Sequence, residues 1–311
     1  MVDIREVAEK IYLIDNKLYS IPKWGSVYLI NEERKALIDP GPTTSANAVL
    51  EGIRKAGVRP EDIDYLIATH IHLDHAGGIG VLVRNMPRAR VVVHYKGAKH
   101  LANPAKLVSS VMAAMGEEMI RKCGEVVPVG EERIKPVGEG DLIEMGDKQV
   151  LRFIEAPGHA SHELCIHESR NNGLFSGDAI GVSVADNEVL IPVTPPPSFD
   201  LEVYLDTLKR LTSLKASAIY YAHFGVSNKV AEDLKLATDK LQSWADIVVK
   251  ALDEDGFDSA AKKLRAQLYL ELEPARKMNS LYKYLTGGIA ALNVAGYIKY
   301  YQNKNDKKEA N

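Results

Sequence analysis

Apolar residues along the chain follow two kinds of spacing, and the spacing changes near residue 228. Before that point, short apolar and β-branched runs recur between turn residues, a pattern typical of buried strands. These runs cover residues 11–14, 27–30, 36–38, 64–68, 90–94, 150–154, 163–167, 173–176 and 218–221. Helical spacing over 46–56 separates two of them, which predicts strand, helix, strand and therefore an α/β fold.

Helical spacing dominates two other parts of the chain. Residues 96–122 carry an apolar face at helical intervals and are expected to be a helical insertion. Residues 228–303 show no strand signal and predict helices broken at Asp255-Gly256, Pro274 and Gly287-Gly288. The expected domains are therefore an α/β domain over 1–227, a helical domain over 228–303 and a frayed polar tail over 304–311.

Composition narrows the class of protein. The chain has 311 residues, 46% of them hydrophobic and 26% charged, and this fits one large and one small globular domain. A formal net charge of -3 argues against nonspecific nucleic-acid binding. With only Cys123 and Cys165, no disulfide framework is expected, although a single bridge stays open. No apolar signal region or membrane span is visible, so a cytoplasmic protein without a membrane partner is expected.

Metal-capable side chains are most concentrated directly after the apolar run at 64–68. His70, His72, Asp74 and His75 place four metal-capable side chains within six positions. On extended backbone, the first two would point the same way, as a zinc or iron site requires. The other two lie past the strand end and could turn toward a different point, so this stretch could hold parts of two adjacent metal sites. The competing interpretation is a polar turn with solvated histidines.

Other candidate ligands also follow predicted strands. His159 comes after a Pro-Gly turn, Asp178 after a glycine, and His223 after the last strand. A lone histidine is more often structural, so each is weak evidence alone. Asp39, at the end of the run 36–38, is either a plain turn residue or an anchor behind a metal ligand. Two further histidines, His94 and His100, lack ligand-like spacing and are expected to be ordinary packing or surface residues.

Taken together, these positions resemble the metallo-β-lactamase superfamily, in its glyoxalase II and lactonase-like branch. The resemblance covers about residues 7–225. It rests on the following elements: His70-Ile71-His72-Leu73-Asp74-His75, Pro157-Gly158-His159, Gly177-Asp178, His223 and Leu37-Ile38-Asp39-Pro40-Gly41. It implies an α/β fold with four αββα layers, in which two mixed sheets face each other and helices lie outside, here with a C-terminal helical extension.

The resemblance also implies a set of metal ligands. One metal would take His70, His72 and His159, a second would take Asp74, His75 and His223, and Asp178 would bridge them. Two divalent ions are implied, zinc first, with iron or manganese as alternatives. A hydroxide held between them would be the nucleophile, with Asp74 as the catalytic residue that orients it.

This chain departs from the family pattern in two places. Ala222-His223-Phe224-Gly225 stands where a Gly-His-Gly type motif is usual, which puts the shape of that loop in question. The interval between the first histidine motif and His159 is longer than in compact members of the family.

One branch of the family is disfavoured by a single position. His72 stands where the diiron oxygen-reducing branch has glutamate, which argues against electron transfer.

The function expected from this resemblance is hydrolysis of an ester, thioester or lactone in a small molecule. Trp24, Tyr28 and Tyr204 are candidate pocket walls, although tyrosines are more often packing residues. Three alternatives stay open: an RNA or phosphodiester hydrolase, a mononuclear iron persulfide dioxygenase, and a non-catalytic binding protein. An RNA-binding patch would use the basic residues Lys262, Lys263, Arg265, Arg276, Lys277 and Lys283, which are otherwise a solvated helix face. Excess apolar residues over 282–298 suggest a homodimer contact or packing onto the catalytic domain.

Overall fold

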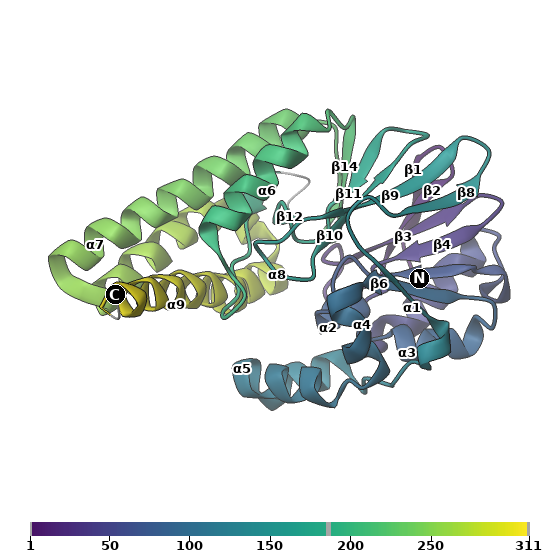
Figure 1. Ribbon diagram of the computed structural model, residues 1–311, viewed down its shortest axis with the longest axis horizontal. Coiled ribbons are helices and arrows are strands. Elements are labelled where there is room, and N and C mark those ends of the chain that lie inside the picture. The colour runs from purple at the N-terminus through teal and green to yellow at the C-terminus, as the bar shows by residue number, and fades with distance from the viewer. Residues whose placement is uncertain (1, 185–187, 310–311) are drawn as a thin grey trace. The chain divides into compact units, whose positions relative to one another are not determined.

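The computed structural model describes residues 2–184 and 188–309 (Figure 1). The chain forms two compact units. The first comprises Met1–Glu155, His162–Gly177 and Ala216–Asn228, and the second comprises Ala156–Ser161, Asp178–Lys215 and Lys229–Asn311. The second unit thus contains more than the C-terminal helices, because it also takes the segments that carry His159 and Asp178.

The first unit contains a seven-stranded sheet whose strands lie in sequence order. Its strands are β1 (Ile4–Ala8), β2 (Ile11–Asp15), β3 (Ser26–Asn31), β4 (Lys35–Ile38), β5 (Tyr65–Ile67), β6 (Arg90–His94) and β7 (Ile134–Val137). Strands β1 to β4 pair antiparallel, and β4 to β7 pair parallel. Because β4 and β5 are parallel neighbours, their carboxyl ends meet at one edge, which brings the residues after them together.

The same unit contains a six-stranded sheet in the order β15-β14-β11-β10-β9-β8. Its strands are β8 (Leu142–Gly146), β9 (Gln149–Glu155), β10 (Leu164–Glu168), β11 (Gly173–Phe175), β14 (Ala218–Tyr221) and β15 (Gly225–Ser227). Only β11 and β14 pair parallel. The helices of this unit are α1 (Ala46–Lys55), α2 (Leu73–Ala76), α3 (Ile79–Leu82), α4 (Tyr95–Ala102) and α5 (Ala105–Cys123). Helices α4 and α5 occupy the stretch 96–122, for which helical spacing predicted helix.

Strand β3 shows how the layers are held together. Its alternate residues enter two different cores: Val27 and Leu29 pack with α1 and α3, whereas Tyr28 and Ile30 pack with the second sheet. A strand buried on both faces reads as a continuous apolar run, and this is the pattern of residues 27–30. The core between the sheets also contains Phe153 and Phe175.

The second unit is mainly helical. It contains α6 (Leu201–Ser213), α7 (Val230–Leu272), α8 (Asn279–Tyr284), α9 (Ala290–Glu309) and the hairpin of β12 (Val182–Val184) and β13 (Val189–Ile191). Two of the three expected breaks are confirmed: helix α7 bends at Gly256, whose φ of 79° is a left-handed conformation, and a 3-10 turn (Glu273–Lys277) contains Pro274. The third expectation is wrong, because Gly287-Gly288 lies in a π turn (Leu285–Ile289) that joins α8 and α9 without a break in the helix. Asp200 caps α6 as expected, since its side chain accepts from the Val203 amide.

The apolar residues near the C-terminus are used inside the second unit. Leu285, Ile289, Val294 and Tyr297 are buried, and the Tyr297 hydroxyl donates to the Leu241 carbonyl at 2.6 Å. The apolar excess that suggested a dimer contact is therefore largely covered within the unit. Helix α9 continues to Glu309, so the polar segment expected to fray is helical to that residue, and 310–311 lie outside the described residues.

None of the helices in the described part of the chain combines the length and apolar character of a bilayer-spanning segment.

Candidate metal centre

The histidine-rich stretch lies in the loop and short helix that follow β5. The strand ends at Ile67, so His70 and His72 lie in a loop, and helix α2 carries Asp74 and His75. The strand therefore ends before the first two histidines, although His72 keeps an extended backbone with φ of -59° and ψ of 149°. They still approach each other, because the His70 Nε2 lies 2.9 Å from the His72 Nδ1 with the rings nearly perpendicular at 83°.

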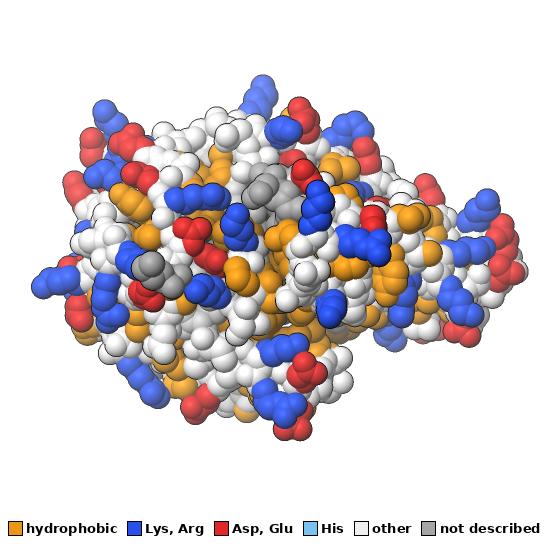
Figure 2. Space-filling view, turned by 180° about the vertical axis from the view of Figure 1, so that it is seen from behind, with side chains coloured by type: hydrophobic (Ala, Val, Ile, Leu, Met, Phe, Trp, Pro, Cys, Tyr) orange, Lys and Arg blue, Asp and Glu red, His pale blue; other side chains and the backbone are white. Residues whose placement is uncertain are grey.

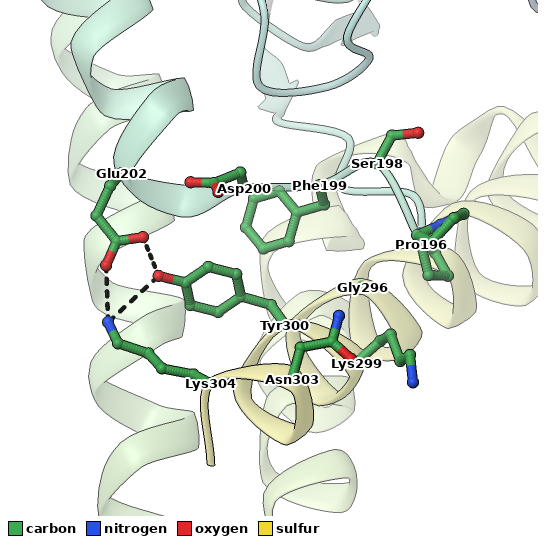
Figure 3. A pocket seen from close by; sticks show the side chains of 11 residues that line it. Pro196, Ser198, Phe199, Asp200, Glu202, Gly296, Lys299, Tyr300, Asn303 and Lys304 are labelled. Carbon is green, nitrogen blue, oxygen red and sulfur yellow. Dashed lines mark hydrogen bonds and ion pairs between the residues drawn. The ribbon is translucent and has the colours of Figure 1, made fainter. Parts of the chain in front are cut away.

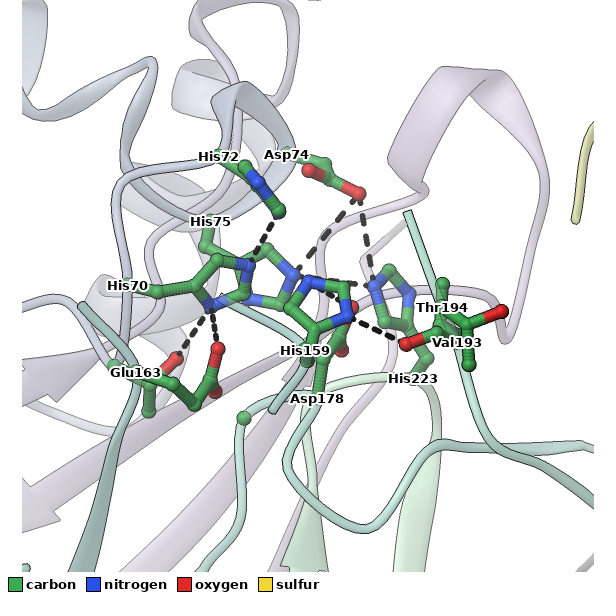
Figure 4. Close-up of polar contacts among 12 residues, drawn as sticks. His70, His72, Asp74, His75, His159, Glu163, Asp178, Val193, Thr194 and His223 are labelled. Carbon is green, nitrogen blue, oxygen red and sulfur yellow. Dashed lines mark hydrogen bonds and ion pairs between the residues drawn. The ribbon is translucent and has the colours of Figure 1, made fainter. Parts of the chain in front are cut away.

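His70 is held from behind by two oxygen atoms (Figure 4). Its Nδ1 lies 3.2 Å from the Glu163 Oε2 and 3.2 Å from the Thr69 Oγ1. Glu163 is buried and precedes β10, a strand of the other sheet. A carboxylate at Nδ1 favours the proton on that nitrogen, which leaves the Nε2 lone pair facing His72.

His75 and His223 show the same arrangement. The His75 Nδ1 lies 3.2 Å from the Asp39 Oδ2, and the His223 Nδ1 lies 3.2 Å from the Trp24 carbonyl oxygen. Both partners are acceptors, which favours the tautomer with the proton on Nδ1 and the lone pair on Nε2. The two Nε2 atoms lie 3.3 Å apart. Converging imidazole nitrogens at this separation are a donor arrangement that fits a metal ion.

Asp74 completes this group of ligand atoms. The Asp74 Oδ2 lies 3.6 Å from the His223 Nε2 and 4.0 Å from the His75 Nε2, and the three residues offer ligand atoms all within 4.8 Å of one another. The Asp74 side chain is 23% exposed, whereas those of His75 and His223 are 2% and 4% exposed. Asp74 therefore forms the solvent-facing side of the group.

Asp39 supports the ligand loop as well as His75. Its backbone has a φ of 50°, and its carboxylate accepts from the Thr69 amide at 2.8 Å and the Thr69 hydroxyl at 2.8 Å. A buried carboxylate that accepts several hydrogen bonds fixes the position of its donors. Asp39 thus occupies the place expected of an anchor behind a ligand.

His159 and Asp178 lie together in the second unit. The His159 Nδ1 lies 2.9 Å from the Val193 carbonyl oxygen, and its Nε2 lies 3.6 Å from the Asp178 Oδ2. The carbonyl is an acceptor and favours the proton on Nδ1, so the Nε2 and the carboxylate oxygen face each other as candidate ligand atoms. This pair therefore has the same donor chemistry as the group in the first unit.

Helix α6 positions this pair. The Tyr204 hydroxyl donates to the Asp178 carbonyl at 2.8 Å, and the Thr207 hydroxyl donates to the Pro157 carbonyl at 2.6 Å. A Cβ on Gly158, which has a φ of 140°, would lie 2.6 Å from the Tyr204 Cα. The Pro-Gly-His turn therefore needs glycine so that α6 can approach closely.

All three residues expected to line the pocket contact other parts of the protein. Tyr28 is a core residue and not a pocket wall, because it is buried between the sheets and its hydroxyl donates to the Tyr221 and Gly225 carbonyls. The Trp24 ring packs against His223 with centroids 4.4 Å apart and planes tilted by 32°, and its carbonyl also contacts that candidate ligand. Tyr204 is buried against the Asp178 backbone. A substrate contact by Trp24 or Tyr204 stays a prediction.

Sequence reasoning missed Glu163. The alternating pattern over 163–167 predicts only a strand there, and a carboxylate at the start of an otherwise apolar strand is the one local signal that marks Glu163. His94 is a packing residue, as expected: it is buried and its Nδ1 accepts from the Lys96 amide. Both cysteines are free and buried, so they form no bridge. Burial and the Asp74 carboxylate raise the pKa of Cys123 to about 12, which keeps this thiol protonated.

A separate hollow of about 390 Å³ lies within the second unit (Figure 3). It is bounded by the loop at 196–199, the start of α6 and helix α9. Glu202 accepts from Lys304 at 2.7 Å and contacts the Tyr300 hydroxyl. Because these charged groups satisfy one another, the hollow presents no ligand set comparable to the histidine groups.

A family model described as the metallo-beta-lactamase superfamily matches residues 24–223, which span all seven candidate ligands. The chain belongs to the metallo-β-lactamase superfamily. The match confirms the resemblance, and the mixed sheets, the outer helices and the C-terminal helical extension confirm the expected fold class.

The chain is similar to three proteins of differing printed descriptions. The "Metallo-beta-lactamase fold-containing protein ST1585" of Sulfurisphaera tokodaii is 30% identical over 73% of this chain and 84% of its own. Its crystal structure aligns with a TM-score of 0.63 over 86% of this chain and 98% of that chain, at 25% identity. An N-acyl homoserine lactonase from a Bacillus species is 26% identical, covering 68% of this chain and 84% of the lactonase. The human acyl-coenzyme A thioesterase MBLAC2 is 26% identical over 57% of this chain, which spans 65% of that protein.

Proposed function

We propose that this protein is a dinuclear metal-dependent hydrolase of a small ester, thioester or lactone. The proposal joins the histidine group of the first unit with the pair in the second. His70, His72 and His159 would hold one metal, Asp74, His75 and His223 the other, and Asp178 would bridge them. Imidazole and carboxylate donors suit zinc first, with iron or manganese as alternatives.

The observation that carries the proposal is the orientation of the imidazoles. His75 and His223 face acceptors with their Nδ1 atoms and turn both Nε2 atoms inward to a separation of 3.3 Å. The Asp74 carboxylate lies beside both nitrogens, 3.6 Å from the His223 Nε2 and 4.0 Å from the His75 Nε2, so two imidazoles and a carboxylate converge on one point. The inward nitrogens are therefore placed for a cation.

Bound divalent metals would supply an acidified water and would polarise the substrate carbonyl oxygen. Asp74, the most exposed residue of its group, is placed to accept a proton from that water and to orient it toward the carbonyl carbon. The buried histidines keep their positions through Asp39, Glu163 and the Trp24 carbonyl, so the chain itself contributes a preorganised site.

The named activities of two relatives support carbonyl substrates. One relative is a lactonase and one is an acyl-coenzyme A thioesterase, and both reactions attack an acyl carbon. The basic residues that an RNA substrate would need are partly neutralised: Lys263 pairs with Glu254 at 2.9 Å, and Arg276 pairs with Glu273 at 2.6 Å. Figure 2 shows positive and negative side chains interspersed over the face in view. These features favour a small-molecule substrate.

The test combines metal analysis with a substrate panel of thioesters, esters and lactones. We expect two divalent metals per chain and hydrolysis of at least one acyl class. The variant His72→Ala should lose more than about 100-fold in activity, because even residues behind ligands typically cost 10–100-fold. His100→Ala, on α4 and outside the candidate ligands, should retain activity. A single bound iron with oxygen consumption on a persulfide would replace this proposal with the dioxygenase alternative.

A further inference from the structure

We propose that Glu163 is a positioning residue for His70 and that it sets the affinity of the first metal site. This inference rests on the proposed function, because it concerns the same centre. Glu163 matches no part of the family pattern described above. Its carboxylate is nevertheless fully buried and lies 3.2 Å from the His70 Nδ1.

The backbone around Glu163 is tied to the ligand loop. The amide of Leu164, the next residue, donates to the Thr69 carbonyl at 2.8 Å. Thr69 precedes His70, so strand β10 and the loop after β5 are joined directly beside the ligand. The Glu163 side chain therefore starts from a fixed point, and its carboxylate reaches His70 with little freedom.

Gly177 leaves the space that this carboxylate occupies. A Cβ at Gly177 would lie 2.3 Å from the Glu163 Oε1 and 2.6 Å from the Thr69 Oγ1. Gly177 has a φ of 50°, which also favours glycine. The glycine before Asp178 therefore makes room for the group behind His70, a role distinct from that of its aspartate neighbour.

Glu163 and Asp39 each lie behind a different candidate ligand. Asp39 faces the Nδ1 of His75, whereas Glu163 faces the Nδ1 of His70. In the proposed assignment these histidines belong to different metals. Loss of one carboxylate should therefore weaken one metal site more than the other, because each raises the basicity of a single ligand.

The experiment is a metal titration of the apoprotein by chelator competition, with cobalt(II) absorption as a second readout. Glu163→Gln keeps the shape of the side chain and removes its charge. We expect about 10–100-fold weaker binding at one of two sites and an altered cobalt spectrum. Glu163→Asp keeps the charge but withdraws it by one methylene, and should also weaken that site.

Two variants serve as controls. Glu168 is a buried glutamate at the other end of β10, where it accepts from the Asn171 and Gly173 amides. Glu168→Gln should lower the unfolding temperature without changing either metal affinity. Asp39→Asn should weaken the other site. If Glu163→Gln binds both metals within twofold of the wild-type affinities, the positioning role is refuted. Inactivity of the fully metallated wild-type protein on every acyl substrate would instead refute the proposed function, and the affinity comparison would still stand.

Discussion

At the scale of single residues, each of four candidate ligands has an acceptor behind its Nδ1 atom. The acceptor is Glu163 for His70, Asp39 for His75, the Trp24 carbonyl for His223 and the Val193 carbonyl for His159. This arrangement selects one tautomer in each ring before any ion arrives. Folding therefore orients these four imidazole rings in advance, so metal binding does not have to order them.

The first prediction concerns a methyl group added at Gly177, which faces the Glu163 carboxylate. Gly177→Ala should destabilise the protein by about 2 kcal/mol or more, because it combines left-handed backbone strain with an overpacked site. It should also weaken one metal site by displacing the carboxylate behind His70. Urea unfolding and metal titration measure the two effects.

Gly57→Ala is the matched control for this prediction. Gly57 has a φ of 75°, but a Cβ there would meet nothing within 4 Å. This variant should show only the backbone cost, about 1 kcal/mol, with unchanged metal binding. Equal effects of the two substitutions would show that Gly177 serves the backbone alone.

Sequence alone marks the candidate ligands and one residue behind them, Asp39, but not Glu163. His70, His75 and His223 follow strands in a spacing that a linear pattern can reveal, and Asp39 ends a strand of the same kind. Glu163 acts through a contact across the two sheets, between segments far apart in the chain, so no local spacing marks it. Tyr28 was misinterpreted for the same reason, because the two carbonyls that its hydroxyl contacts lie near residue 223.

At the scale of elements, the turns and helix ends carry most of the positioning. Helix α6 begins at a predicted cap, Asp200, and its Tyr204 and Thr207 hold the segments that carry His159 and Asp178. Helix α4 begins at an unusual cap, because the His94 Nδ1 accepts from the Lys96 amide at 3.0 Å. That contact requires a neutral imidazole.

The His94 cap predicts a pH dependence of stability. Burial lowers the pKa of His94 below its usual value of 6.5, against an opposing effect of Glu155. As the pH falls below about 6.5, the unfolded chain takes up a proton at this residue that the folded chain resists. The free energy of unfolding should therefore decrease with falling pH until the lowered pKa is reached.

Urea unfolding at pH 7.5 and 5.5 measures this contribution by comparison with His94→Asn. Asparagine can cap a helix but does not titrate in this range, so the variant should lose less stability between the two pH values. Other titrating groups cancel in the comparison. An identical loss in both proteins would show that His94 contributes nothing to the pH dependence.

At the scale of the whole molecule, the proposed ligands come from segments around residues 70, 159, 178 and 223 in two compact units. The α/β class, the two sheets and the C-terminal helices follow from hydrophobic spacing and the family motifs. The division into units does not, because segments 156–161 and 178–215 join the C-terminal helices only in three dimensions.

Ligands so far apart in the chain predict that metal stabilises the folded protein. A metal present at 100 times its Kd adds about 2.7 kcal/mol, provided that it binds only the native state. The metallated protein should therefore unfold about 5 °C or more above the chelated protein. Calorimetry with and without chelator measures this difference. Equal unfolding temperatures would contradict metal binding at the proposed centre, and His223→Ala should reduce the difference.

The mixture of imidazoles and carboxylates described above should determine which ions the proposed centre prefers. In the proposed assignment, Asp74 and Asp178 are carboxylate ligands, whereas Asp39 and Glu163 lie behind the imidazoles of His75 and His70. Imidazole nitrogens with a few carboxylate oxygens suit borderline divalent ions such as zinc better than hard ions such as calcium, which prefer oxygen ligands alone. The proposed centre should therefore discriminate between ions by the softness of its donor atoms.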